Sequence, residues 1–186
     1  MSRQQFTDLV RAGLVALPQH LKAALRLMDD PNIPDEGRAV AAGAVLHFLS
    51  GSNTIPGLRG GVLSYVDDVL VLRLACARIG AIAPDAMAQH RADLPELLGP
   101  LDDDVGVIRS HLGPGIGLLD KVVERLGQLK HHGRSAAQCV ADEEAGTMLH
   151  DEVLSVLVDV DLEEEAVARA LKQLDPVLEG LRQRGG

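Results

Sequence analysis

Apolar residues recur every three or four positions along most of the chain, which is the spacing of one face of an α-helix. Proline and glycine clusters interrupt this pattern and mark the ends of the expected helices. The alternation of β-branched, aromatic and polar residues that is typical of strands is missing. Helices are expected over approximately residues 6–28 (interrupted or restarted at Pro18), 36–49, 65–82, 101–112, 119–132, 135–157 and 161–181, with a short one within residues 84–100. We therefore predict an all-α fold of about seven helices.

Capping residues mark several of the expected helix starts. Asp35 directly follows a proline-containing break and is placed to cap the helix from about residue 36. The spacing of a capping box occurs at Ser64 and Asp67, at Ser135 and Gln138, and at Asp161 and Glu164.

The segment between residues 84 and 100 is the only plausible domain boundary. We divide the chain into residues 1–91, an N-terminal helical hairpin unit, and residues 92–186, a C-terminal helical bundle. Neither part alone contains enough apolar residues for a large core, so we expect the two to pack together as one unit.

Composition and charge restrict the classes of function. The net charge is −9 and aromatic residues make up 2% of the chain. A negatively charged protein repels a phosphate backbone, and aromatic platforms for stacking single-stranded bases are missing, so we exclude nucleic-acid binding. No signal peptide or membrane-spanning stretch is recognisable. Cys76 and Cys139 belong to no metal-binding pair, and we expect buried, reduced thiols, which predicts a cytoplasmic protein. The alternative is a disulfide between them.

Residues 17–83 contain an ordered series of elements: "LPQHLKAALRLMDDPNIP", "AVAAGAVLHFLS", a loop with "TIP", and "SYVDDVLVLRLACARI". This series resembles the YkvA-like family, the domain of unknown function numbered 1232. Five residues match the family's loop and the helix start that follows it: Ile55, Pro56, Tyr65, Asp67 and Asp68. Asn53 stands where the family usually has an aspartate. The resemblance implies a helical hairpin with a characteristic loop, but no established reaction, and many members look membrane-associated.

Asp67 and Asp68 are the most conspicuous candidate site residues. Both lie in the first turn of a helix, where negative charge is favourable, although one acidic residue would suffice for this. Together with His47 and Asn53 they could hold the loop by hydrogen bonds to its backbone, which is the interpretation we favour. The alternative is a cation site with oxygen ligands, for which Asp67 and Asp68 are weak candidates. We expect His47 to be a buried histidine of the core.

The remaining signatures do not indicate a metal or nucleotide site. Residues 102–106, "DDDVG", lack the closing glutamate of a calcium loop and read as a helix N-terminus. The adjacent His131 and His132 precede Gly133 and suit a helix C-terminus. We expect no cofactor. The acidic segment 142–165 is a solvated helical face or, functionally, a docking surface for a basic partner.

Three hypotheses follow. The first is a non-enzymatic, all-helical interaction or scaffold protein that binds a protein partner or self-associates. The second is a peripheral membrane or apolar-ligand binding protein, which would expose an apolar patch or contain a dry pocket between the helices at 36–49 and 65–82. The third is a small metal-dependent hydrolase that uses His47, Asp67 and Asp68, which would require these side chains to converge in one cleft.

Overall fold

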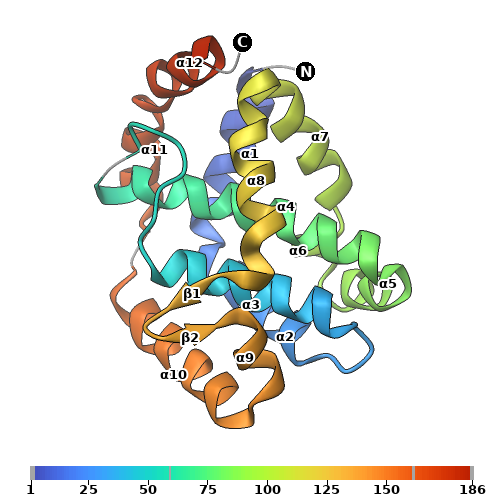
Figure 1. The fold of residues 1–186 in the computed structure, drawn as a ribbon. Helices are drawn as coiled ribbons and strands as arrows, with labels where there is room; N and C mark the ends of the chain where they lie inside the picture. Colours follow the sequence, from blue (N-terminus) through green and yellow to red (C-terminus); the bar gives the residue numbers. More distant parts are fainter. Residues whose placement is uncertain (1–2, 59, 161, 185–186) are drawn as a thin grey trace.

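The computed structural model describes residues 3–58, 60–160 and 162–184, and 81% of the structure is helical (Figure 1). The all-α prediction is therefore confirmed. The described residues form ten α-helices of eight residues or more, and the predicted number of about seven is wrong. The N-terminal elements are α1 (Arg3–Val15), α2 (Leu17–Asp29), α3 (Asp35–Leu49), the 3-10 turn η1 (Gly61–Leu63), α4 (Ser64–Ile82), α5 (Pro84–Asp93) and the short α6 (Pro95–Leu98).

The C-terminal part contains more breaks than the apolar pattern predicts. Its elements are α7 (Leu101–Leu112), η2 (Gly113–Gly115), α8 (Ile116–Arg125), η3 (Leu126–Gln128), β1 (Lys130–His131), β2 (Arg134–Ser135), the short α9 (Ala136–Ala141), α10 (Glu143–Asp159), α11 (Glu164–Leu171) and α12 (Leu174–Arg184). The helix expected over residues 135–157 is two helices, because the extended backbone of Asp142 ends α9 and its side chain caps α10 at the N–H of Ala145. The helix expected over 161–181 is likewise divided, into α11 and α12.

The helix expected to continue to residue 132 ends at Arg125 and is followed by a small hairpin. β1 and β2 pair antiparallel, with Lys130 opposite Ser135 and His131 opposite Arg134. The two residues between the strands, His132 and Gly133, both have positive φ, 48° and 80°. Such a pair of left-handed residues forms the tight turn that joins two antiparallel strands, so His131 and His132 belong to a hairpin and not to a helix C-terminus.

The predicted caps differ in outcome. The capping box of Ser135 and Gln138 is present, with both reciprocal hydrogen bonds formed. Asp35 does not cap α3, because Pro34 occupies the cap position and the Asp35 carboxylate lies 3.2 Å from Arg38. The box predicted at Ser64 is wrong, since α4 has no side-chain cap there. The predicted cap at Asp161 lies outside the described residues.

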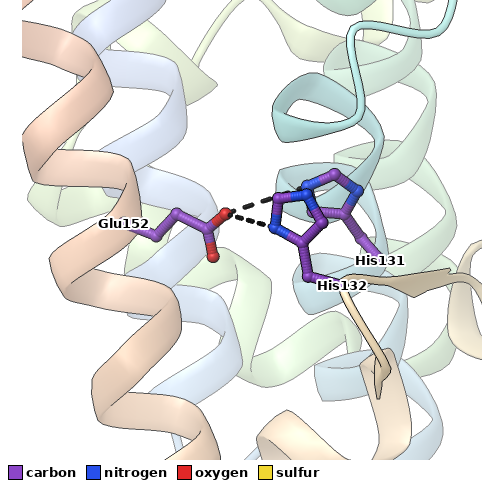
Figure 2. Close-up of side chains that lie close together, drawn as sticks. All are labelled: His131, His132 and Glu152. Carbon is purple, nitrogen blue, oxygen red and sulfur yellow. Dashed lines mark ion pairs between the residues drawn. The ribbon is translucent and has the colours of Figure 1, made fainter.

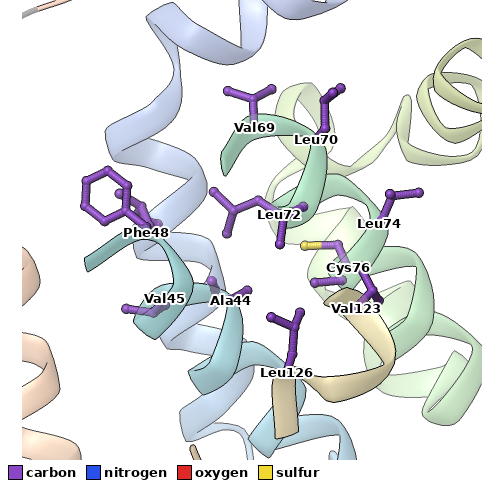
Figure 3. Packing of buried hydrophobic residues seen from close by; sticks show 14 of the residues in the cluster. Ala44, Val45, Phe48, Val69, Leu70, Leu72, Leu74, Cys76, Val123 and Leu126 are labelled. Carbon is purple, nitrogen blue, oxygen red and sulfur yellow. The ribbon is translucent and has the colours of Figure 1, made fainter. Parts of the chain in front are cut away.

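Helices α3 and α4 lie in the middle of the molecule, and their neighbours cover them on nearly all sides (Figure 1). Figure 3 shows Leu72 of α4 pointing toward Phe48 and Ala44 of α3, with Leu126 of η3 near Ala44. The buried apolar cluster extends from Phe6 to Leu178 and includes residues on both sides of the segment 84–100. The division into two domains stays a prediction.

Small residues allow the C-terminal part to approach α3 closely. A Cβ atom on Gly43 would lie only 2.0 Å from the carbonyl oxygen of Leu126. Such a distance is far inside van der Waals contact, so only glycine lets η3 pack on α3 in this way. Cys76 and Cys139 are free and buried, as expected. Within the described residues, no helix combines the length and the apolar character needed to cross a membrane.

Candidate functional site

Asp67 is fully buried and holds the loop between α3 and α4 by three hydrogen bonds. Its Oδ2 accepts from the backbone N–H of Thr54 at 3.1 Å, and its Oδ1 accepts from the N–H of Ile55 at 3.1 Å. The third partner is the Nε2 atom of His47, 2.9 Å from Oδ2. An ionised carboxylate only accepts hydrogen bonds, so His47 donates here from Nε2. Asp67 therefore fastens both α3 and the loop to the first turn of α4.

Asn53 continues the same loop structure. With its amide nitrogen facing inward, it donates to the carbonyl oxygens of Leu58 and Ser64, each at 2.9 Å. The side chain of Ser50 donates to the carbonyl oxygen of His47 at 2.7 Å, which secures the C-terminal end of α3. These bonds satisfy backbone groups that a loop lying against the core would otherwise leave unpaired.

The side chains of the other predicted loop residues, Ile55, Pro56 and Tyr65, make no hydrogen bond to Asp67. Ile55 is fully buried in the apolar cluster, whereas Pro56 is exposed. Tyr65 is half-buried, and its ring lies 6.0 Å from that of Phe48, with the two planes tilted by 32°. The loop thus combines one apolar anchor, Ile55, with the polar anchors Asp67 and Asn53.

Asp68 differs from its neighbour because it has little to bind. It is 4% exposed, and its Oδ1 atom finds no hydrogen-bond partner among the described residues. The nearest charged group is His47, whose Nε2 lies 3.9 Å from Oδ1. Burial raises the pKa of Asp68 to about 7, an effect that His47 opposes and the nearby charge of Asp67 increases.

His47 is buried as well, at 4% exposure. Burial disfavours its charged form, but the hydrogen bond to Asp67 and the charges of Asp67 and Asp68 outweigh this effect, so its pKa is raised. The three side chains therefore do converge, as the hydrolase hypothesis requires. However, they converge inside the protein, and both oxygens of Asp67 are already bound to donors. This arrangement favours a structural role over binding of a cation or a substrate.

A second buried polar group joins α4 to α7, with an acidic partner for Arg73 that the sequence analysis did not identify. Arg73 of α4 is 7% exposed, lies 3.0 Å from the carboxylate of Asp104 in α7, and donates to the carbonyl oxygen of Leu97. His20 of α2 is buried nearby; burial, followed by the charge of Arg73, lowers its pKa to about 3. Asp104 was interpreted only as part of a helix N-terminus, and a pair separated by 31 positions leaves no local pattern in the sequence.

A third polar group lies at the β1–β2 turn and faces α10. Figure 2 shows His131 and His132 pointing toward Glu152, and these three residues are the candidate metal-binding group among the described residues. The Oε1 atom of Glu152 lies 3.8 Å from Nε2 of His131 and 3.4 Å from Nδ1 of His132. Burial, then the charge of His132, lowers the pKa of His131 despite the opposing charge of Glu152.

Comparisons with known proteins add no functional information: no family model, curated protein or solved structure matches the chain. The resemblance of residues 17–83 to the YkvA-like family therefore stays a prediction.

Proposed function

We propose that this protein is a non-enzymatic, all-helical interaction protein that binds a basic amphipathic helix of a protein partner through the outer face of α10. The observation that carries the proposal is the exposure of three large apolar side chains on that helix. Met148 is 50% exposed, Leu154 51% and Val158 83%. They are three of the five exposed large apolar residues that the described chain contains, and they fall within 11 positions.

Helical geometry places these residues on one side of α10. At 3.6 residues per turn, Met148, Leu154 and Val158 fall within about a third of the helix circumference, together with the exposed Asp151 and Ser155. We call these five residues the α10 face. Isolated exposed apolar residues are common, but several on one helix face are typical of a surface that another helix covers.

Charge determines which partner fits the α10 face. Helix α10 begins with Glu143 and Glu144 and contains no lysine or arginine. The chain as a whole carries a net charge of −9. A second copy would present the same negative charges, and an anionic membrane surface would be repelled. A partner with apolar residues on one side of a helix and lysines or arginines beside them complements both properties of the face.

The buried loop cluster supports a scaffold role for the rest of the chain. His47, Asp67 and Asp68 are each at most 4% exposed. Asp67 holds loop backbone groups, which stabilises the α3–α4 pair and supports the helices packed on it. An enzyme built on these residues would need an opening that brings a substrate to them.

The test measures binding of a fluorescent amphipathic helix of leucine and lysine, with a peptide of the same composition in scrambled order as control. Fluorescence anisotropy should show binding of the amphipathic peptide to the wild type that weakens with added salt. The double variant Leu154→Ser, Val158→Ser should bind at least tenfold more weakly. The matched control, Leu118→Ser, removes an apolar side chain of α8 that is 39% exposed and should stay within about twofold of the wild type.

Four results would contradict the proposal. Equal binding of both peptides would show that charge alone is recognised. Equal binding by wild type and double variant would place the contact elsewhere. A wild type that is dimeric by light scattering, with a monomeric double variant, would assign the α10 face to self-association. If the wild type co-sediments with neutral or anionic lipid vesicles and the double variant does not, the result would instead favour the peripheral membrane hypothesis.

A further inference from the structure

We propose that His131, His132 and Glu152 form an open binding site for a transition-metal dication of the Zn²⁺ class, which links the β1–β2 turn to α10. This site is separate from the α10 face and from the loop cluster of Asp67. Its three side chains supply two imidazole nitrogens and one carboxylate oxygen, which is a ligand set typical of zinc sites that keep a further position open.

The separations between the donor atoms match this assignment. All three ligand atoms lie within 4.8 Å of one another. Zinc binds nitrogen and oxygen at about 2.0–2.2 Å in tetrahedral geometry, which separates neighbouring ligand atoms by about 3.4 Å. The distance from His132 Nδ1 to Glu152 Oε1 is 3.4 Å, and the distance from His131 Nε2 to the same oxygen is 3.8 Å. Rotation of the imidazole rings out of their stacked arrangement would direct both nitrogens at one ion and complete the site.

The turn brings two neighbouring histidines to the same side, which an extended strand would not do. Successive side chains of a strand point to opposite faces. His132 has a φ of 48° and is the only non-glycine residue with positive φ in the described chain. With this backbone, the two imidazole rings stack with centroids 3.8 Å apart and planes inclined by 28° (Figure 2). The turn that reverses the chain thus also places both imidazoles toward Glu152.

Arg134 holds Glu152 from the other side. It forms an ion pair with Oε2, so Oε1 remains available to face the histidines. A ligand carboxylate that a neighbouring group orients in this way is common around metal ions. The guanidinium also offsets part of the charge of the carboxylate, so the two imidazole nitrogens largely set which metal the site prefers. This favours Zn²⁺, Co²⁺, Ni²⁺ or Cu²⁺ and disfavours Mg²⁺ and Ca²⁺, which need several anionic oxygens.

Burial gives the site a closed inner side and an open outer side. The side chains of His131 and Glu152 are 14% and 25% exposed, whereas that of His132 is 71% exposed. A metal ion held here would keep contact with water on the His132 side. Because the ligands come from the turn and from α10, binding would also tie these two segments together and stabilise the folded chain.

The experiment uses the full chain without an affinity tag, freed of metal by a chelator that is then removed. Isothermal titration with Zn²⁺ should show one ion per chain, and the unfolding temperature should rise with Zn²⁺ but not with millimolar Mg²⁺. Substitution with Co²⁺ should give visible absorption bands of low coordination number. His132→Asn is the main variant, because asparagine tolerates positive φ and preserves the turn while removing one ligand. We expect it to weaken Zn²⁺ binding at least tenfold.

Two further variants make the result unambiguous. Glu152→Gln, which removes the ligand charge, should weaken binding by a similar factor and change the Co²⁺ spectrum. His150→Gln removes a histidine of the same helix that lies 2.9 Å from Asp29, outside the site, and should bind Zn²⁺ like the wild type. Absence of Zn²⁺ binding by the wild type would overturn the proposal. Equal binding by the wild type and the folded His132→Asn variant, checked by circular dichroism, would overturn it as well.

Discussion

Replacing Asp68 with asparagine should remove much of the pH dependence of stability that this buried carboxyl group produces. Asp68 has a pKa of about 7 in the folded chain, compared with an ordinary value of 3.8. Between these two pH values the folded protein binds a proton that the unfolded protein releases. The contribution of Asp68 to the free energy of unfolding therefore decreases as the pH rises through this window and levels off above pH 7.

The size of the effect follows from the same values. From pH 5 to the pKa of about 7, the loss amounts to about 1.4 kcal/mol for each pH unit, or about 3 kcal/mol in total. His47, whose pKa is raised, also lowers the free energy of unfolding of the wild type as the pH rises further. The variant keeps the hydrogen bond between His47 and Asp67, so it retains a decrease of this kind. Relative to the wild type, Asp68→Asn should thus gain about 3 kcal/mol between pH 5 and pH 8.

Urea unfolding of both proteins at pH 5, 6, 7 and 8 measures this difference directly. Comparing the two proteins at each pH cancels the contributions of groups that the substitution leaves unchanged. Asp85→Asn, which removes an exposed carboxylate from the first turn of α5, controls for the loss of one negative charge. A difference between the wild type and Asp68→Asn that is the same at pH 5 and pH 8 would refute the reasoning, because it would mean that water reaches Asp68.

Three other substitutions test the remaining interactions. Asp67→Asn should destabilise the protein at pH 7 by about 3 kcal/mol in urea unfolding, because an amide cannot accept from all three donors; a loss below about 1 kcal/mol would contradict its role in the loop. Gly43→Ala should lower the free energy of unfolding by about 2 kcal/mol or more, since its Cβ would overlap Leu126, and should therefore lower the unfolding temperature. Gly117→Ala, in open space on a helix, should be neutral or stabilising. Arg73→Met should lower the free energy of unfolding by about 3 kcal/mol, because it leaves the carboxylate of Asp104 and the carbonyl oxygen of Leu97 without their partner. An unchanged urea midpoint would show that the ion pair does not stabilise the fold.

The apolar periodicity determined the helical class of the fold by itself, because helix formation depends on local spacing and the pattern repeats over most of the chain. Local signals also located the break before α3 and the capping box of Ser135, since the groups involved lie within a few positions of one another. Where an apolar pattern continued across a break, as at Asp142, the sequence suggested one helix instead of two.

The candidate sites depended on tertiary structure. Asp67 and Asp68 lie in the same helical turn, yet only Asp67 accepts hydrogen bonds from the loop amides, while Asp68 is buried without a partner for its Oδ1. The pairing of His132 with Glu152, 20 positions away, requires a tight turn and a helix that packs beside it. Long-range packing sets the burial and the partners of a polar side chain. These decide whether it hydrogen-bonds backbone groups, has a shifted pKa or lies beside other potential metal ligands.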